Sequence, residues 1–156
     1  MIISDTSSIS NLFQIERIDL LKSLYGKITI TPAVQRELYA LEEQKEIDNL
    51  KWIKVVAPKD QKKVMKLLEE LDLGEAESIA LAIERKAKYL IIDEYRGRLI
   101  AEQYGVKIVG VLGILIQAKQ DGLIDSVKDE VQKLRQVGFR LNQRLVDGVL
   151  KRLGEI

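Results

Sequence analysis

Histidine and cysteine, two residue types that dominate catalytic and metal sites, are absent from this 156-residue chain. Their absence excludes zinc sites built from thiolates or imidazoles, cysteine nucleophiles, Ser-His-Asp triads and acid-base catalysis by imidazole. Carboxylates, hydroxyls, Lys, Arg and Tyr remain for chemistry. Because carboxylate oxygens are hard ligands, a metal held by this chain is expected to be magnesium, manganese or calcium.

An excess of charge of one sign is also missing. The 25 basic and 24 acidic residues leave a net charge of +1, so any surface that binds nucleic acid has to be a local patch. No apolar run approaches the roughly 18 residues that a membrane span requires, and the N-terminus lacks the pattern of a signal peptide. We therefore expect a cytoplasmic protein with no membrane partner.

Apolar residues make up 46% of the chain, which is enough to bury one core, so we expect a single domain over residues 1–156. Strands that alternate with helical patterns predict a parallel sheet covered on both faces. The expected fold is a three-layer α/β/α arrangement with a central, mainly parallel sheet of four to five strands and a helical C-terminal third. Five short apolar segments have the pattern of strands: residues 1–4, 27–31, 52–57, 89–92 and 106–109.

Capping residues mark the expected helix starts. The side chains of residues 5–8, Asp-Thr-Ser-Ser, can cap a first helix, and Thr31-Pro32 has the pattern of an N-cap and first helical position. A charged amphipathic helix is predicted from Lys59 to Leu73 and a second from Glu75 to Lys86, with Gly74 as the junction between them.

Two acids, Asp5 and Asp93, directly follow predicted strands. A carboxylate at such a position is costly to bury unless something pairs with it. In an open parallel sheet, ligands bind beyond the carboxyl ends of the strands, where the strand order reverses. Glu37 lies near the start of the helix after the second strand and Glu75 starts the helix before Asp93, so all four can approach one edge.

Four converging carboxylates would hold one or two divalent ions, which position water and neutralise the charge on a phosphodiester. The alternative for Glu37 or Glu75 taken singly is a solvated surface position, since the chain has 24 acids. Glu77 competes with Glu75. Because side chains at i and i+2 of a helix point apart, we expect Glu75 to be the ligand and Glu77 to support it.

Three further residues are expected to support the ligands. The hydroxyls of Thr6 and Ser7 can hold a ligand carboxylate, although capping of the first helix is an alternative use. Glu94, the neighbour of Asp93, is expected to lie just behind the metal site.

Five segments of the chain together carry a specific pattern: SDTSSISNL, ITPAVQRELYAL, LGEAESIALAIE, LIIDEYRGRLIAEQYG and VGVLGILIQAKQDGLI. In them the chain resembles the PIN-domain family, and within it short PIN-like proteins related to VapC toxin ribonucleases. The resemblance covers essentially the whole chain. It implies a parallel sheet with a central first strand, an acidic site for Mg2+ or Mn2+, and hydrolysis of RNA.

Residue by residue, the resemblance assigns catalytic and metal-site roles to Asp5, Glu37, Glu75 and Asp93. It also implies a toxin role opposed by an antitoxin protein, and we expect a homodimer. Arg96 and Arg98 follow Asp93 closely enough to meet a phosphate of RNA, which arginine binds bidentately. Exposed helix charges that balance nearby glutamates are the alternative.

The C-terminal segment GFRLNQRLVDGVLKRLGE also resembles these proteins. Leu141, Leu145, Val149 and Leu153 recur every four residues, so we expect this helical face to pack on the core, with an antitoxin or dimer contact as the alternative.

The sequence is also compatible with other functions. The chain can be a catalytically inactive PIN-like module that binds RNA or an antitoxin. An aspartyl phosphatase would use Asp5 as nucleophile, but that family usually has a second Asp two residues later, where Ser7 stands. A receiver domain is disfavoured because the adjacent early acids are missing.

Overall fold

The computed structural model describes the backbone of residues 1–156 and all side chains except those of residues 42–45. Five strands form one sheet in the order β3-β2-β1-β4-β5, and all neighbouring strands are parallel. The expected sheet is confirmed, with the first strand at its centre. The strands are β1 (Ile2–Ser4), β2 (Ile28–Ile30), β3 (Ile53–Val55), β4 (Tyr89–Ile91) and β5 (Ile108–Val109).

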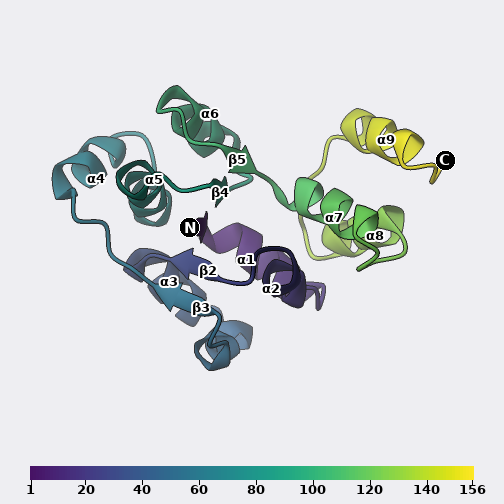
Figure 1. Cartoon of the computed structure of the whole chain (residues 1–156), viewed down its shortest axis with the longest axis horizontal. Helices are drawn as coiled ribbons and strands as arrows, with labels where there is room; N and C mark the ends of the chain where they lie inside the picture. Colours follow the sequence, from purple (N-terminus) through teal and green to yellow (C-terminus); the bar gives the residue numbers. More distant parts are fainter.

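Helices connect the strands and fill the C-terminal third, as expected (Figure 1). Within the described part of the chain, no helix combines the length and apolar character needed to cross a membrane. The α-helices are α1 (Thr6–Gln14), α2 (Asp19–Tyr25), α3 (Pro32–Tyr39), α4 (Gln61–Leu67), α5 (Leu73–Arg85), α6 (Tyr95–Gln103), α7 (Val111–Gln120), α8 (Val127–Gln136) and α9 (Gln143–Arg152), and the 3-10 helix η1 covers Glu42–Asn49.

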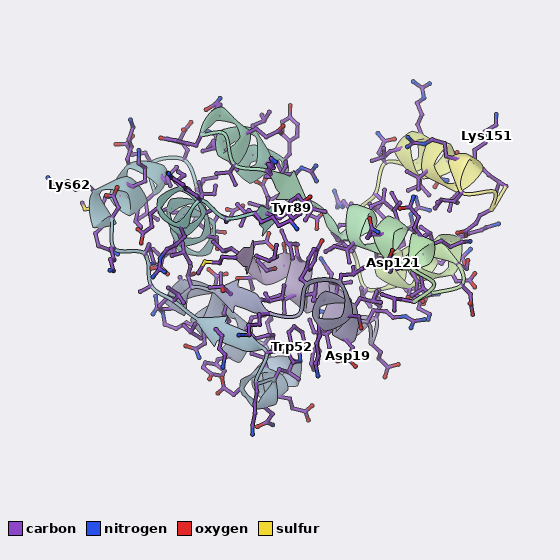
Figure 2. All side chains as sticks on the ribbon, in the orientation of Figure 1. Asp19, Trp52, Lys62, Tyr89, Asp121 and Lys151 are labelled. Carbon is purple, nitrogen blue, oxygen red and sulfur yellow. The ribbon has the colours of Figure 1, made fainter. Side chains whose placement is uncertain are left out.

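Both faces of the sheet are buried under helices. Ile2 and Ile91 belong to an apolar cluster with residues of α1, α2, α7 and α8, whereas Ile3 and Leu90 belong to a second cluster with residues of α4, α5 and α6. Successive residues of a strand point to opposite faces, so one apolar strand supplies both clusters. The three-layer α/β/α prediction is confirmed. Side chains fill the space between the layers, and Lys62 and Lys151 lie near opposite ends of the long axis (Figure 2).

The boundary between α4 and α5 differs from the prediction. α4 ends at Leu67, and Gly74 lies inside the first turn of α5 and does not separate the two helices. The reason is Asp72, whose carboxylate accepts a hydrogen bond from the backbone N–H of Glu75 at 2.9 Å and starts α5 early.

The C-terminal helix also departs from the expected face. α9 buries Val146, Val149 and Leu150, while Leu145 is 53% exposed. Residues four apart on an α-helix drift by about 40° per step, so a stripe with that spacing leaves the packed face. Leu141 and Leu153, at its ends, are half-buried against the core.

The strand order reverses at β1, with β2 and β3 on one side and β4 and β5 on the other. At this point the backbone N–H of Asp5 donates to the carbonyl of Ile91 at 3.0 Å. The carboxyl ends of β1 and β4 therefore lie together, and the residues that follow them share one edge of the sheet.

Candidate active site

A cleft with a volume of about 370 Å³ opens beside the end of β1. Three of the four acids predicted from the sequence, Asp5, Glu37 and Glu75, line it, although they come from three different parts of the chain. We call it the acidic cleft, and its lining residues are Asp5, Thr6, Ser7, Ser10, Glu37, Leu41, Asp72, Glu75 and Glu94.

Asp5 is the N-cap of α1 and is 3% exposed. Its carboxylate accepts hydrogen bonds from the backbone N–H of Ser8 at 2.9 Å and from the hydroxyl of Ser7 at 3.2 Å. Burial raises the pKa of Asp5 to about 6; hydrogen bonds from Ser8 and Ser7 oppose this rise, and the negative charge of Asp93 adds to it.

Ser8 joins Asp5 to Asp93. Its hydroxyl donates a hydrogen bond to Oδ2 of Asp93 at 3.1 Å, while its backbone N–H donates to Asp5. The N–H of Val111, at the start of α7, donates to Asp93 at 3.1 Å and 3.2 Å. Burial raises the pKa of Asp93, and the hydrogen bonds from Val111 and Ser8 and the charge of Arg98 oppose that rise.

Asp93 does not line the acidic cleft. It lines a neighbouring groove of about 660 Å³. The fourth predicted acid therefore lies beside the other three, linked through Ser8, and faces a different hollow. We call this hollow the arginine groove, and its lining residues are Asp93, Tyr95, Arg98, Ile108, Val109, Gly110, Leu112, Gly113, Ile116, Phe139, Arg140, Leu141, Asn142, Leu145, Val149 and Arg152.

Glu37 projects from α3 and accepts a hydrogen bond from the hydroxyl of Thr6. The position of α3 depends in turn on Glu77, which is 9% exposed and accepts from the backbone N–H of Ala33 at 2.9 Å. A carboxylate at a helix N-terminus is favourable because it meets unpaired N–H groups and the positive end of the helix dipole. Glu77 thus holds α3 in place and does not face the cleft.

Glu75 lies in the first turn of α5, and its Oε2 atom is buried with no hydrogen-bond partner among the described residues. Burial raises the pKa of Glu75 to about 8, helped by the negative charges of Asp72 and Glu94. An unpaired buried carboxylate oxygen is unfavourable, so this atom marks a position where a cation would be stabilising.

Thr6, Ser7 and Glu94, the three residues expected to support the ligands, lie beside the acids and line the acidic cleft. The N-cap of α1 is Asp5, so the hydroxyls of Thr6 and Ser7 are free to donate to carboxylates. Glu94 caps α6 by accepting from the N–H of Gly97 at 2.8 Å, and it lines the acidic cleft.

Sequence reasoning missed two participants. Asp72 lines the cleft and caps α5; the pattern Asp72-Leu-Gly-Glu75, a capping residue followed three positions later by Glu, was a usable signal. Ser8 bridges two acids that are 88 residues apart, Asp5 and Asp93, and no local pattern distinguishes it from its serine neighbours.

The two predicted RNA-binding arginines diverge. Arg96 forms an exposed ion pair with Glu70 at 3.0 Å, which fits the alternative of a charge-balanced helix surface. Arg98 lines the arginine groove beside Asp93, together with Arg140 and Arg152.

Residues 1–155 match a protein family described as a PIN domain. The chain belongs to the PIN-domain family. A search of curated proteins found no match. This PIN domain therefore has a nuclease-type fold, and the acidic cleft lies at the sheet edge where the carboxyl ends of β1 and β4 meet.

Among the described side chains of this PIN domain, no three acids stand together as a group able to hold a metal ion. Three carboxylates are bound by their own donors: Glu37 by Thr6, Asp5 by Ser8 and Asp93 by Val111. The available ligands are nevertheless carboxylate oxygens, and Oε2 of Glu75 is buried and unpaired. This chemistry fits magnesium or manganese, and the ligand set stays a prediction.

Proposed function

We propose that this PIN domain is a metal-dependent endoribonuclease whose catalytic and metal-binding residues are Asp5, Glu37, Glu75 and Asp93. The observation that carries the proposal is that Asp5, Glu37 and Glu75 line one cleft where the strand order reverses, with Asp93 attached through Ser8. Asp5 is buried among neutral donors and Oε2 of Glu75 is buried without a partner among the described residues, so a cation bound in this cleft would be stabilising.

Mg2+ or Mn2+ bound by these carboxylates would neutralise charge on the phosphodiester and activate water. The side chains around the acids have a complementary task, which is to orient them. Thr6 fixes Glu37 and Ser8 fixes both Asp5 and Asp93. Preorganised hydrogen bonds of this kind keep ligand carboxylates in position.

The arginine groove is the proposed path for the RNA strand next to the cleft. Three arginines line it, from α6, from the segment before α9 and from α9 itself, and Asp93 is the one acid among the described residues that line it. Figure 1 shows α6 and α9 on either side of the connection from β5 to α7. Arginine binds phosphate bidentately, and Tyr95, which is 75% exposed, offers a ring on which a base can stack.

The resemblance to VapC toxins supports a finer proposal, that the protein is the toxin of a toxin-antitoxin pair. On this proposal it works in the cytoplasm as a homodimer and is bound by an antitoxin protein.

One observation favours a second function, a PIN-like module that binds RNA or an antitoxin without cutting. Asp93 lines the arginine groove and not the acidic cleft, so the four acids do not share one cavity. An assay of RNA cleavage distinguishes the two functions.

The test of the proposed function is cleavage of a labelled single-stranded RNA with Mg2+, with Mn2+ or with EDTA. We expect cleavage with either metal and none in EDTA. Asp5→Asn and Asp93→Asn should each lower kcat by about 100-fold or more, because each removes a charged metal ligand.

Asp19→Asn is the matched control, since Asp19 is an exposed acid in the first turn of α2, outside the cleft and the groove. It should cleave like the original chain. RNA binding without any cleavage in either metal would favour the binding module, and cleavage that survives Asp5→Asn would exclude Asp5 as a metal ligand.

A further inference from the structure

Three glycines lie against three of the acids. A Cβ atom at Gly74 would lie 2.5 Å from Oε1 and 2.8 Å from Oε2 of Glu37. A Cβ atom at Gly110 would lie 2.6 Å from Oδ1 of Asp93 and 2.8 Å from Nη1 of Arg98. Each of these distances is shorter than any normal contact, so each carboxylate occupies the space that a side chain would fill.

Gly97 lies against both Ile92 and Glu75, and its contact with the carboxylate is tight but less close than those of Gly74 and Gly110. Its Cβ atom would lie 3.1 Å from Oε2 of Glu75, the buried oxygen without a hydrogen bond, and 2.7 Å from Cδ1 of Ile92. The missing side chain at Gly97 therefore leaves room for both the Glu75 carboxylate and the side chain of Ile92, which directly follows β4.

Backbone conformation does not explain these three glycines. Five of the ten glycines in the chain have the positive φ angles that favour glycine, and Gly74, Gly97 and Gly110 are not among them. Gly74 and Gly97 also lie in helices, where alanine is intrinsically preferred to glycine. At Gly74 and Gly97 the absence of a side chain is therefore disfavoured locally. It provides room for a carboxylate at Gly74, and for Ile92 and a carboxylate at Gly97.

The remaining glycines show that this contact is not general. Gly148, in α9, has no atom within 4 Å of its Cβ position, and Gly113 meets only Val109. Of the five glycines without positive φ, the three at the candidate active site are the ones that face acids.

We propose that Gly74, Gly97 and Gly110 are positioning residues that seat Glu37, Glu75 and Asp93 for metal binding, an inference that rests on the proposed nuclease function. Gly74 and Gly97 lie in the first turns of α5 and α6, and Gly110 is the N-cap of α7. The carboxylates thus pack against the N-terminal ends of these three helices.

Gly74 is the sharpest position for a test. A methyl group there meets the flexible end of the Glu37 side chain, so it displaces the carboxylate without forcing backbone apart. The substitution therefore tests the position of the carboxylate without disturbing the fold: Gly74→Ala should fold normally while the Glu37 carboxylate moves. A misplacement of about 1 Å at a catalytic site can cost about 100-fold in rate.

The experiment compares Gly74→Ala with Gly148→Ala as the matched helix control. In EDTA both variants should melt no lower than the original chain. Gly74→Ala should weaken binding of Mn2+ alone by about tenfold in calorimetry and lower kcat by about 100-fold with little change in KM. Gly148→Ala should leave both quantities unchanged.

A size exchange supplies a readout that a purely structural role would not move. Glu37→Asp shortens the side chain by one methylene, so the double variant G74A/E37D should recover at least about tenfold of the kcat lost in Gly74→Ala. Glu37→Asp alone should be impaired. Unchanged Mn2+ affinity and kcat in Gly74→Ala, or no recovery in the double variant, would overturn the seating role.

Failure of the nuclease function gives a different result. If the original chain neither binds Mn2+ nor cleaves RNA, the proposed function itself is wrong and the seating role falls with it. Should Gly74→Ala not fold, Gly110→Ala tests the seat of Asp93. Its methyl group also meets Arg98, which is not a proposed metal ligand, so Mn2+ affinity is the readout there, and an unchanged affinity would count against the proposal.

Discussion

Asp5 is almost fully buried, yet the donors that it meets, the backbone N–H of Ser8 and the hydroxyl of Ser7, are neutral. Burial therefore raises its pKa from 3.8 to about 6. A carboxyl group whose pKa is higher in the folded state destabilises the fold once the pH exceeds its unfolded value. Ionised Asp5 thus costs stability at neutral pH unless a cation offsets its charge.

Replacing this carboxylate should stabilise the metal-free protein. We expect Asp5→Asn in EDTA at pH 7.5 to raise the free energy of unfolding by about 1–3 kcal/mol, because Asn caps a helix as well as Asp and carries no charge. Added Mg2+ or Mn2+ should raise the Tm of the original chain and leave that of Asp5→Asn unchanged. Thermal melts measure both effects.

The pH dependence of this stability difference follows from the raised pKa of Asp5. The stability difference between Asp5→Asn and the original chain should be full above about pH 6 and should shrink as the pH falls. It should be lost below 3.8, where Asp5 is protonated in both states. Asp19→Asn should show no such difference. A lower Tm for Asp5→Asn in EDTA at pH 7.5 would contradict the argument.

Single residues differ in how far the sequence predicts them. Asp5 and Asp93 could be identified because a carboxylate at the end of an apolar strand is unusual by itself. The role of Glu77 could not, since its partner, the N–H of Ala33, is 44 residues away and becomes a neighbour only when α3 and α5 pack together.

At the scale of elements, the N-terminus of α8 is held by Glu155. This carboxylate accepts hydrogen bonds from the N–H groups of Val127 and Lys128, from the hydroxyl of Ser126 and from the ammonium of Lys119. Burial alone would raise its pKa, but these donors together lower it to about 2. Glu155 therefore ties the C-terminal segment to α7 and α8.

Glu155→Gln should lower the free energy of unfolding at pH 7 by about 1 kcal/mol, because a neutral amide binds the helix N-terminus and Lys119 more weakly. A lowered carboxyl pKa gives stability that is present above the unfolded value of 4.5 and is lost as the pH falls through about 2. The difference between variant and original chain should therefore vanish between pH 4.5 and 2 in denaturant titrations.

The control for Glu155 is Glu102→Gln, an exposed acid on α6. It should change stability little at any of these pH values. A deficit of Glu155→Gln that persists undiminished at pH 2 would show that the carboxylate charge is not its cause.

Element positions followed closely from periodicity and capping residues. Each predicted strand overlaps an observed one. The central strands β1 and β2 are fully buried, as a continuous apolar strand predicts, whereas the edge strands β3 and β5 are partly exposed. The predicted boundary between α4 and α5 was wrong because α5 begins directly after its N-cap, Asp72, and not after Gly74. Leu145 was placed on the wrong face because four-residue spacing does not keep to one side of a helix.

At the scale of the whole molecule, the acidic cleft and the arginine groove meet near residues 93–95, with Glu94 in one and Asp93 and Tyr95 in the other. Negative charge is thus concentrated where a cation is proposed, and positive charge lies along the neighbouring groove. A chain with a net charge of +1 separates its charges in space, which composition alone does not reveal.

Loss of two groove arginines should weaken RNA binding in a salt-dependent way. We expect R140A/R152A to bind a labelled single-stranded RNA in EDTA at least about tenfold more weakly. The slope of log K against log salt should become shallower by about 1.4, since each phosphate contact to a single strand contributes about 0.7. Fluorescence anisotropy at several salt concentrations measures both.

R135A/R144A removes the same charge from exposed positions on α8 and α9 that do not line the groove. It should change the affinity and the slope much less. Equal losses in the two double variants would mean that RNA senses only the net charge of the molecule and not the groove.

The sequence by itself determined the parallel α/β/α fold and the acids at the strand ends, because periodicity, capping and strand-end polarity are local properties of the chain. The family followed from the resemblance of five segments to PIN domains. Tertiary structure alone decided that Asp5, Glu37 and Glu75 share a cleft, that Ser8 links it to Asp93, and that glycines leave room for three carboxylates. These contacts join residues tens of positions apart, and their distances depend on how helices pack over the sheet, which no local pattern encodes.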